Sequence, residues 1–250
     1  MIMYNICISI PIKNDNFIEI KTLVDKALTF NPAFIEFRFD YINKLEYLTE
    51  KFVRQIKDLI ENQAYCIFTL RHDSEGGRNK IEKSHRIEKL EVLIGSQPDF
   101  LDIEMNSDLD TLRCIINLSY MKKVNLIFSY HNLEETPDYE IVKEIILRFE
   151  ETVIKNRMNE FDILGKSVYK LIFTAQNFED NITPLKLCQD LSRNNKKVIS
   201  FCMDYLGILS RLMCVKLGSF LTYATLEEQT APGQIYVKTM QELYELISNE

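Results

Sequence analysis

The chain lacks several sequence features that mark particular classes of protein. Its six cysteines include no C-x-x-C pair, which argues against a cysteine-type zinc site. No G-x-G-x-x-G or G-x-x-x-x-G-K motif is present, so nothing favours a nucleotide-binding fold. The N-terminal run 1–12 has no basic leader and is too short to span a bilayer. With only seven glycines and 46% hydrophobic residues, the 250-residue chain is not of low complexity and can bury a large core.

The charge of the chain argues against two kinds of partner. Its formal net charge of −7 disfavours binding to nucleic acids and to membrane surfaces, because both are themselves negative. An anionic small substrate is still compatible, since a few arginines inside a pocket outweigh a diffuse negative surface. Several cysteines, such as Cys66 and Cys202, lie in apolar runs that suit buried, reduced thiols. We therefore expect a cytoplasmic protein.

Short β-branched and aromatic runs alternate with longer segments of helical period. The expected strands recur roughly every 30 residues, as in a repeat of strand, loop, helix and loop. They cover residues 4–10, 33–39, 64–70, 100–105, 124–130, 170–175, 197–203 and 219–224. Because no Pro/Gly/Ser-rich linker interrupts the repeat, we expect an α/β protein with a single (β/α)₈ TIM barrel, one catalytic domain over 1–250. A doubly wound open sheet is the alternative, because periodicity cannot show whether the sheet closes.

Local signals support helices between these strands. Apolar residues share one helical face in 20–28, in 142–149 and in 236–247. Thr136 offers a cap for the second of these helices, with Pro137 at the first helical position.

The second expected strand carries charges where a barrel strand should be apolar. Glu36, Arg38 and Asp40 alternate with aromatic residues, so all three lie on one face. A parallel barrel covers both faces of each strand, and buried charges are costly unless they pair or form a polar site. The pattern therefore indicates either an ion-pair cluster or a binding site inside the barrel.

Opposite charges on the next strands can neutralise one another in the barrel mouth. Arg71 ends the third expected strand, and Asp102 and Glu104 share one face of the fourth. For these two acids and for Asp40, a structural ion-pair cluster is at least as good an interpretation as ligand contact. For Glu36, Arg38 and Arg71 a functional role is favoured, because active sites of barrels assemble at the C-terminal strand ends.

Two side chains have the chemistry of a catalytic pair. His131 follows directly on an apolar strand and suits a general base. Lys170 begins the sixth expected strand, where an inward amine can form an imine with a ketone. A lysine that merely snorkels at a strand end is one alternative, and Lys166 as the reactive lysine is another. Imine chemistry needs the neutral amine, which desolvation and a nearby cation such as Arg211 favour.

Three loops add polar groups at the same end of the barrel. Gly76 and Gly77 would let the loop after the third strand fold over a pocket, with Glu75 near its hinge. Arg211 can clamp a carboxylate through two parallel hydrogen bonds, or form a salt bridge with a neighbour. The loop 230–234 follows the eighth strand, where barrels usually bind anions.

Taken together, these segments resemble type I 3-dehydroquinate dehydratases over nearly the whole chain. The matching pieces occur in family order: E-F-R-F-D at 36–40, F-T-L-R-x-x-x-E-G-G ending at Gly77, D-I-E at 102–104, S-Y-H at 129–131, Lys170, M-x-x-x-G-x-x-S-R ending at Arg211 and T-A-P-G-Q ending at Gln234. Each motif alone is modest, and their ordered combination is specific. The resemblance implies the (β/α)₈ fold, a lyase reaction without metal or cofactor, and a homodimer.

The resemblance also implies the catalytic roles. Lys170 would form a Schiff base with the C3 ketone of 3-dehydroquinate, a small-molecule substrate. His131 would remove a C2 proton, and Glu75 would orient its imidazole. Loss of water and hydrolysis of the imine would release 3-dehydroshikimate, within the shikimate pathway of aromatic amino acid biosynthesis.

The substrate-binding roles follow from the same resemblance. Arg211 and Gln234 would hold the substrate carboxylate, and Thr230 keeps a hydroxyl in the same loop. The residues expected to bind the hydroxyls of the substrate are Glu36, Arg38 and Arg71.

Two other functions share parts of this pattern. Another Schiff-base barrel, such as a small aldolase, shares the lysine and the fold but does not explain His131, Glu75 and Arg211 together. A non-catalytic barrel that senses quinate-type ligands would be expected to have lost the lysine or the histidine.

Overall fold

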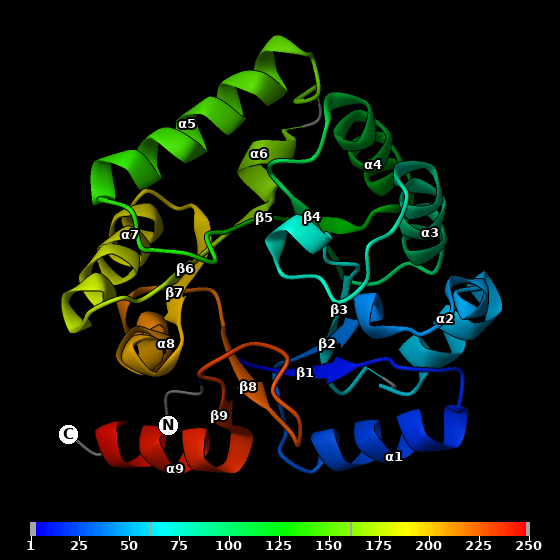
Figure 1. Cartoon of the computed structure of the whole chain (residues 1–250), viewed down its shortest axis with the longest axis horizontal. Coiled ribbons are helices and arrows are strands. Elements are labelled where there is room, and N and C mark those ends of the chain that lie inside the picture. The colour runs from blue at the N-terminus through cyan, green and yellow to red at the C-terminus, as the bar shows by residue number, and fades with distance from the viewer. Residues whose placement is uncertain (1–3, 61, 161, 249–250) are drawn as a thin grey trace.

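A ring of parallel strands forms the centre of the molecule, and helices surround it (Figure 1). The computed structural model describes residues 4–60, 62–160 and 162–248, so positions 1–3 of the N-terminal run lie outside the described residues. The strands are β1 Ile6–Pro11, β2 Phe34–Arg38, β3 Tyr65–Thr69, β4 Phe100–Glu104, β5 Asn125–His131, β6 Val168–Thr174, β7 Lys197–Met203, β8 Thr222–Thr225 and β9 Ile235–Tyr236. The helices are α1 Phe17–Leu28, α2 Glu50–Asp58, α3 Lys83–Gly95, α4 Leu109–Lys122, α5 Tyr139–Lys155, α6 Ile163–Lys166, α7 Ile182–Arg193, α8 Ile208–Met213 and α9 Val237–Ser248.

The sheet follows the order β7-β6-β5-β4-β3-β2-β1-β8-β9, and each neighbouring pair is parallel. A bridge between Val198 of β7 and Ser219, just before β8, joins the two sides of the ring. The backbone N–H of Phe220 donates to the carbonyl of Val198 at 2.6 Å there. The expected (β/α)₈ barrel is therefore confirmed, with the short β9 as an addition. The β7–β8 seam is paired at its N-terminal end, away from the strand ends that carry the candidate site.

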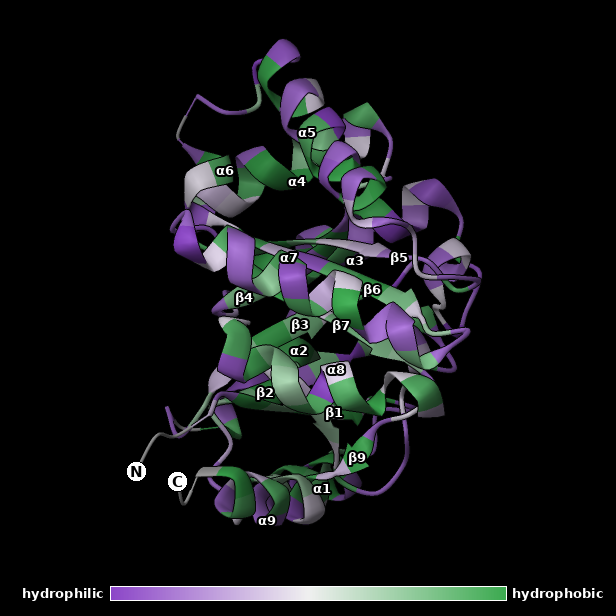
Figure 2. Ribbon diagram, turned by 90° about the vertical axis from the view of Figure 1, so that its left-hand side faces the viewer, coloured by the Kyte–Doolittle hydropathy of each residue, from purple (hydrophilic) through white to green (hydrophobic). Residues whose placement is uncertain are grey.

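Burial explains why these segments form a barrel. Each residue of β2 and of β4 is buried, as expected for parallel strands covered on both faces. The helices bury one face only, and in α1 that face holds Ile20, Val24 and Ala27. Figure 2 shows hydrophobic strands between helices with hydrophilic outer sides. No helix within 4–60, 62–160 and 162–248 is long and apolar enough to cross a membrane.

Two local expectations were wrong. Thr136 does not cap α5: Asp138 stands at the cap position, and the Thr136 hydroxyl donates to the carbonyl of Thr174 instead. Lys170 does not begin its strand, because β6 starts at Val168 and the lysine lies inside it. The expected strand therefore began two residues late, since Val168 and Tyr169 are strand-forming residues and both are buried.

Three aromatic rings fill the N-terminal end of the barrel. Phe34 of β2 lies 5.9 Å from Phe100 of β4 and 5.3 Å from Phe220, measured between ring centroids. Phe100 and Phe220 are 5.8 Å apart. These are favourable distances for tilted aromatic pairs. The rings close the end of the barrel opposite to the charged strand ends.

We expect Phe100→Ala to lower the free energy of unfolding by ~3 kcal/mol, because the side chain is only 7% exposed and its removal leaves a cavity among rings. Urea unfolding measures the change. Tyr205→Ala is the control, since that side chain is 78% exposed and its loss should cost less than ~0.5 kcal/mol. Equal effects of the two substitutions would contradict the packing role of the rings.

Candidate active site

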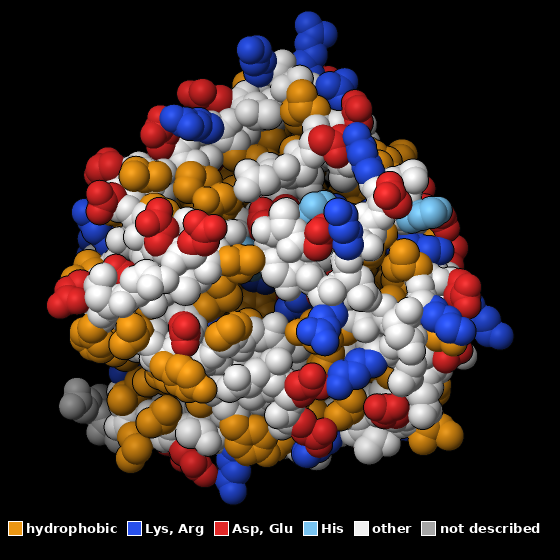
Figure 3. Space-filling view, in the orientation of Figure 1, with side chains coloured by type: hydrophobic (Ala, Val, Ile, Leu, Met, Phe, Trp, Pro, Cys, Tyr) orange, Lys and Arg blue, Asp and Glu red, His pale blue; other side chains and the backbone are white. Residues whose placement is uncertain are grey.

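One cavity of about 110 Å³ opens at the C-terminal ends of the strands. It brings together every residue predicted from the sequence as catalytic or substrate-binding: Glu36, Arg38, Arg71, Glu75, His131, Lys170, Arg211, Thr230 and Gln234. Figure 3 shows this face of the molecule, with a hollow near its centre. Chain segments far apart in sequence therefore meet at one point.

Lys170 points into the barrel from the middle of β6. Its Nζ lies 2.9 Å from Asp102 Oδ2 and 3.6 Å from Glu36 Oε1. The ring of Tyr223 faces the same nitrogen, 4.5 Å from the ring centroid. The ion pairs of Lys170 are thus with carboxylates, and Arg211 lines the same cavity without an ion pair to it.

Lys166 lies elsewhere. It ends α6, is exposed, and lines a different cavity, together with residues 119–126 at the N-terminal end of β5. Between α5 and β6 the chain forms the short helix α6, which ends two residues before β6 begins. Of the two lysines, only Lys170 lines the cavity.

His131 is the last residue of β5, and Glu75 holds its ring. Nδ1 lies 3.0 Å from Glu75 Oε2, and the same oxygen accepts the backbone N–H of His131 at 2.9 Å. Burial, together with the positive charges of Arg71 and Lys170, lowers the pKa of His131 well below its usual value. The imidazole is therefore neutral at pH 7. With Nδ1 turned to a carboxylate, Nε2 keeps a free lone pair for a proton.

Burial raises the pKa of Glu75 to about 7, although the nearby Arg71 guanidinium opposes the shift. The carboxyl belongs to a single 3₁₀ turn, Asp73–Glu75, with three residues between it and the end of β3. Gly76 ends that turn with φ +85°, and a Cβ on Gly77 would lie 2.1 Å from the carbonyl oxygen of Arg71. Both glycines are therefore needed for the chain to bring Glu75 back over the barrel.

Arg71 is the centre of a buried ion-pair cluster. Its guanidinium lies 2.8 Å from Asp102 Oδ2 and 2.8 Å from Glu104 Oε1, and it also donates to the hydroxyl of Ser129. Burial opposes the charge of Arg71, but the surrounding carboxylates outweigh it and raise its pKa. Burial likewise opposes the charge of Asp102, but Arg71 and Lys170 hold the pKa of this carboxyl far below its usual value. The neutralisation that the sequence suggested between β3 and β4 is present.

The two charges on β2 have different partners. Glu36 accepts hydrogen bonds from the hydroxyls of Ser9 and of Thr69, the latter at 2.8 Å. Arg38 forms a two-pronged pair with Asp40, at 2.8 and 2.9 Å, through Nε and one terminal nitrogen. Asp40 lies in the turn after β2, so the cluster interpretation fits it. The second terminal nitrogen of Arg38 takes no part in that pair.

Arg211 differs from the other buried cations. It is 1% exposed, and no carboxylate in the described part of the chain forms an ion pair with it. One terminal nitrogen donates to the carbonyl of Pro232 at 3.2 Å, the guanidinium stacks on Phe201, and Nε has no hydrogen-bond partner. Burial without an anion lowers the pKa of Arg211 to about 10. An anion in the cavity would supply the missing partner.

The loop after β8 brings Thr230 and Gln234 to the cavity wall. The Gln234 side-chain oxygen accepts the backbone N–H of Thr230 at 2.7 Å, and its amide donates to the Thr230 hydroxyl at 3.0 Å. Gly233 has φ +73°, and a Cβ there would lie 2.3 Å from the carbonyl oxygen of Asp204. The loop is thus held by its own side chains beside Arg211.

Sequence reasoning missed several cavity residues. Ser9 and Tyr223 are buried and line the wall beside Glu36 and Lys170. Ser9 pairs in register with Glu36, so alternation along β1 would have placed it on the same inner face. Nothing in the sequence singled out Tyr223, since an aromatic residue in a strand is usually core.

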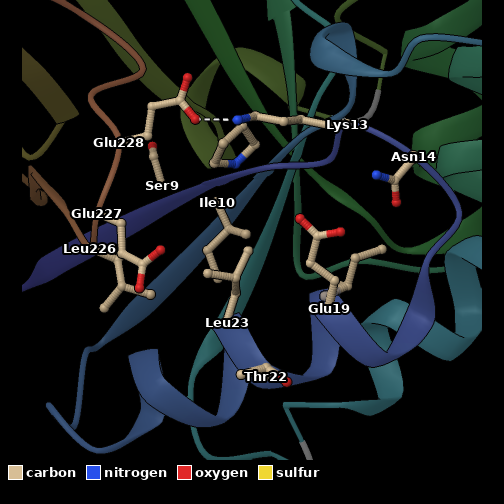
Figure 4. Close-up of a pocket in the computed structure, with 12 residues that line it drawn as sticks. Ser9, Ile10, Lys13, Asn14, Glu19, Thr22, Leu23, Leu226, Glu227 and Glu228 are labelled. Carbon is tan, nitrogen blue, oxygen red and sulfur yellow. Dashed lines mark hydrogen bonds and ion pairs between the residues drawn. The ribbon is translucent and has the colours of Figure 1, made fainter.

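A second cavity, of about 410 Å³, lies outside the barrel between α1 and residues 226–228 (Figure 4). Lys13 and Glu228 form an ion pair across it, and Asn14 and Glu19 lie near the same rim. It shares Ser9 with the first cavity but contains none of the predicted catalytic or binding residues.

The fold and the site define a class: a parallel (β/α)₈ barrel enzyme with a buried lysine and a carboxylate-held histidine at its C-terminal mouth. The family model of type I 3-dehydroquinase matches residues 6–250. The chain belongs to this family, whose members are hydro-lyases.

Relatives and solved structures agree with this assignment. The chain is similar to 3-dehydroquinate dehydratase of Hydrogenobaculum sp., with 32% identity over 96% of this chain and 97% of the relative. It is also similar to that of Alkaliphilus oremlandii, with 30% identity over 96% and 91%. The crystal structure of the Aquifex aeolicus 3-dehydroquinate dehydratase matches at 27% identity, with a TM-score of 0.73 and 98% coverage of both chains. The type I enzyme of Clostridium difficile, at 23% identity, has the same fold, with a TM-score of 0.81 over 98% of this chain and 92% of that one.

The contrast between Asp102 and Arg211 predicts that substitutions at the two positions change stability by different amounts. We expect Asp102→Asn to lower the free energy of unfolding by ~3 kcal/mol, because it leaves two buried cations without their shared anion. Arg211→Met should cost less than ~1 kcal/mol or be stabilising, because it removes a buried cation that has no anion. Urea unfolding of both variants measures the difference. A larger loss for Arg211→Met than for Asp102→Asn would show that the charge balance is not as described.

Proposed function

We propose that this chain is a 3-dehydroquinate dehydratase that works through a Schiff base on Lys170. The observation that carries the proposal is the meeting of three features in one cavity: the buried Lys170, the Glu75–His131 pair and the unpaired Arg211. The curated relatives bear the name of this activity. The homodimer, the cytoplasmic location and the place in the shikimate pathway remain predictions from the family resemblance.

The proposed reaction begins with binding of the substrate anion. Arg211 pairs with the carboxylate and thereby gains the partner that the protein itself does not supply. Gln234 and Thr230 lie in the adjoining loop and complete this end of the pocket. Glu36 and the free terminal nitrogen of Arg38 face the substrate hydroxyls. Arg71 lines the same wall. Because it is bound to Asp102, Glu104 and Ser129, its main role is to hold these side chains in place.

The neutral amine of Lys170 then attacks the C3 ketone, and the carbinolamine takes up a proton from water and loses its hydroxyl as water to give a cationic imine. The imine draws electrons from the C2–H bond, and His131 Nε2 takes that proton to give an enamine. The enamine expels the C1 hydroxyl, which leaves as water with the proton from His131. Hydrolysis of the resulting imine frees 3-dehydroshikimate and restores the lysine. Asp102, Glu36 and the Tyr223 ring stabilise positive charge on the nitrogen in both imines.

Borohydride reduction in the presence of 3-dehydroquinate tests the covalent step. We expect a stable adduct on Lys170, located by peptide mass mapping, and none in Lys170→Met. Lys166→Met is the matched control and should be trapped as the wild type is, because its side chain lies outside the cavity. Normal turnover by Lys170→Met would rule out this lysine as the imine former. Tight binding without 3-dehydroshikimate would instead indicate a sensor protein.

The pH dependence tests the histidine pair. Activity requires Glu75 as a carboxylate, since a protonated Glu75 would donate to Nδ1 and force the ring proton onto Nε2. We therefore expect kcat to rise with pH through a midpoint near the Glu75 pKa of about 7. Glu75→Gln should lower kcat by ~10- to 100-fold and remove this rise of kcat with pH, which we call the acid limb. A profile that keeps the limb in Glu75→Gln would assign it to another group.

A further inference from the structure

Glu75 forms part of the wall between two cavities. Its Oε2 faces His131 in the catalytic cavity, whereas its Oε1 accepts a hydrogen bond from Asn106 Nδ2 at 3.3 Å. Asn106 follows β4 and lies in a separate cavity of about 170 Å³, which we call the outer cavity. The outer cavity is lined by polar side chains that include Ser74, Arg86, Asn106, Ser107 and Thr111. One carboxylate thus contacts the catalytic base on one side and Asn106 on the other.

Burial raises the pKa of Glu75, and charged or polar groups on several neighbouring elements act on the same carboxyl. Arg71, at the end of β3, favours its ionised form, while Glu104 and Asp102 of β4 oppose it. The His131 backbone N–H, on β5, favours it again. From α3, Arg86 is bound to Glu104 and Lys83 is bound to Asp108, so neither cation pairs with Glu75. On its own turn, Asp73 is in contact with His72.

We propose that Asn106 is a positioning residue that favours the ionised form of Glu75, the partner of His131, through a hydrogen bond from the outer cavity. The proposal rests on the proposed function only for its link to turnover. Its physical basis is that Asn106 is a donor to Oε1, and a donor stabilises the carboxylate over the carboxylic acid. Asn106 touches neither the reacting atoms nor the catalytic cavity.

Two substitutions change this contact in graded steps. Asn106→Ala removes the donor, which raises the pKa of Glu75 and moves the acid limb of kcat to higher pH by about half a unit. Asn106→Asp keeps the shape and adds a negative charge beside Oε1, which moves the limb upward by about one unit. Because only ionisation changes, kcat above pH 9 should stay within about twofold of the wild type.

The matched control is Asn14→Asp, which adds the same charge at the rim of the cavity beside α1 (Figure 4). Its acid limb should coincide with that of the wild type. A purely structural role for Asn106 would lower kcat at all pH values without moving the limb, and that result would overturn the proposal.

A second measurement does not depend on turnover. The chain has only three histidines, so ¹⁵N-labelled histidine gives ring signals that single His→Gln variants can assign. In the ligand-free protein, the His131 signal should report the ionisation of Glu75 near pH 7, with the midpoint higher in Asn106→Asp and unchanged in Asn14→Asp. Coincident midpoints in all three proteins would overturn the role of Asn106. Shifted midpoints in a protein that does not convert 3-dehydroquinate would instead overturn only the proposed function.

Discussion

The carboxylate of Asp102 is the interaction on which the interior of the barrel depends. It lies 2.8 Å from Arg71 and 2.9 Å from Lys170, and it accepts the Ser129 hydroxyl at 2.6 Å. Two cations cannot be buried side by side in a barrel without an anion, because the cost of leaving water is several kcal/mol for each ion. Asp102 makes that burial possible by contacting both. It thereby joins β3, β4, β5 and β6 in one polar layer above the aromatic end of the barrel.

Arg211 has the opposite character. Its guanidinium is as buried as that of Arg71, yet the described chain gives it a carbonyl and an aromatic ring in place of a carboxylate. Such a group reduces stability in the free protein and gains its partner when an anion binds. It lies next to the part of the β7–β8 seam that carries no strand pairing. At the place where the proposed substrate carboxylate would bind, the barrel therefore lacks both strand pairing and an anion for its buried cation.

The sequence predicted the repeat of strands and helices well, because burial on two faces leaves a clear apolar pattern in each strand. It also predicted which side chains share the cavity, since alternation and position at strand ends decide which way a side chain points. It could not predict contacts that depend on the register between strands. Ser129 pairs in register with Lys170, and this fixes the lysine within reach of Asp102. The choice against Lys166 needed the structure of residues 163–166 as the helix α6, because in the sequence both lysines stand close to the apolar run of β6.

The carboxylates around Lys170 indicate which group carries positive charge and which group removes a proton. A lysine held by Asp102 and Glu36 is well suited to carry positive charge, which is what an imine nitrogen needs. Proton removal must come from a neutral group, and His131 is kept neutral by burial and by the positive charges of Arg71 and Lys170. The cation that activates the substrate and the base that deprotonates it therefore require each other: positive charge at Lys170 helps to keep His131 unprotonated, and Glu75 stabilises the imidazolium once the proton has moved.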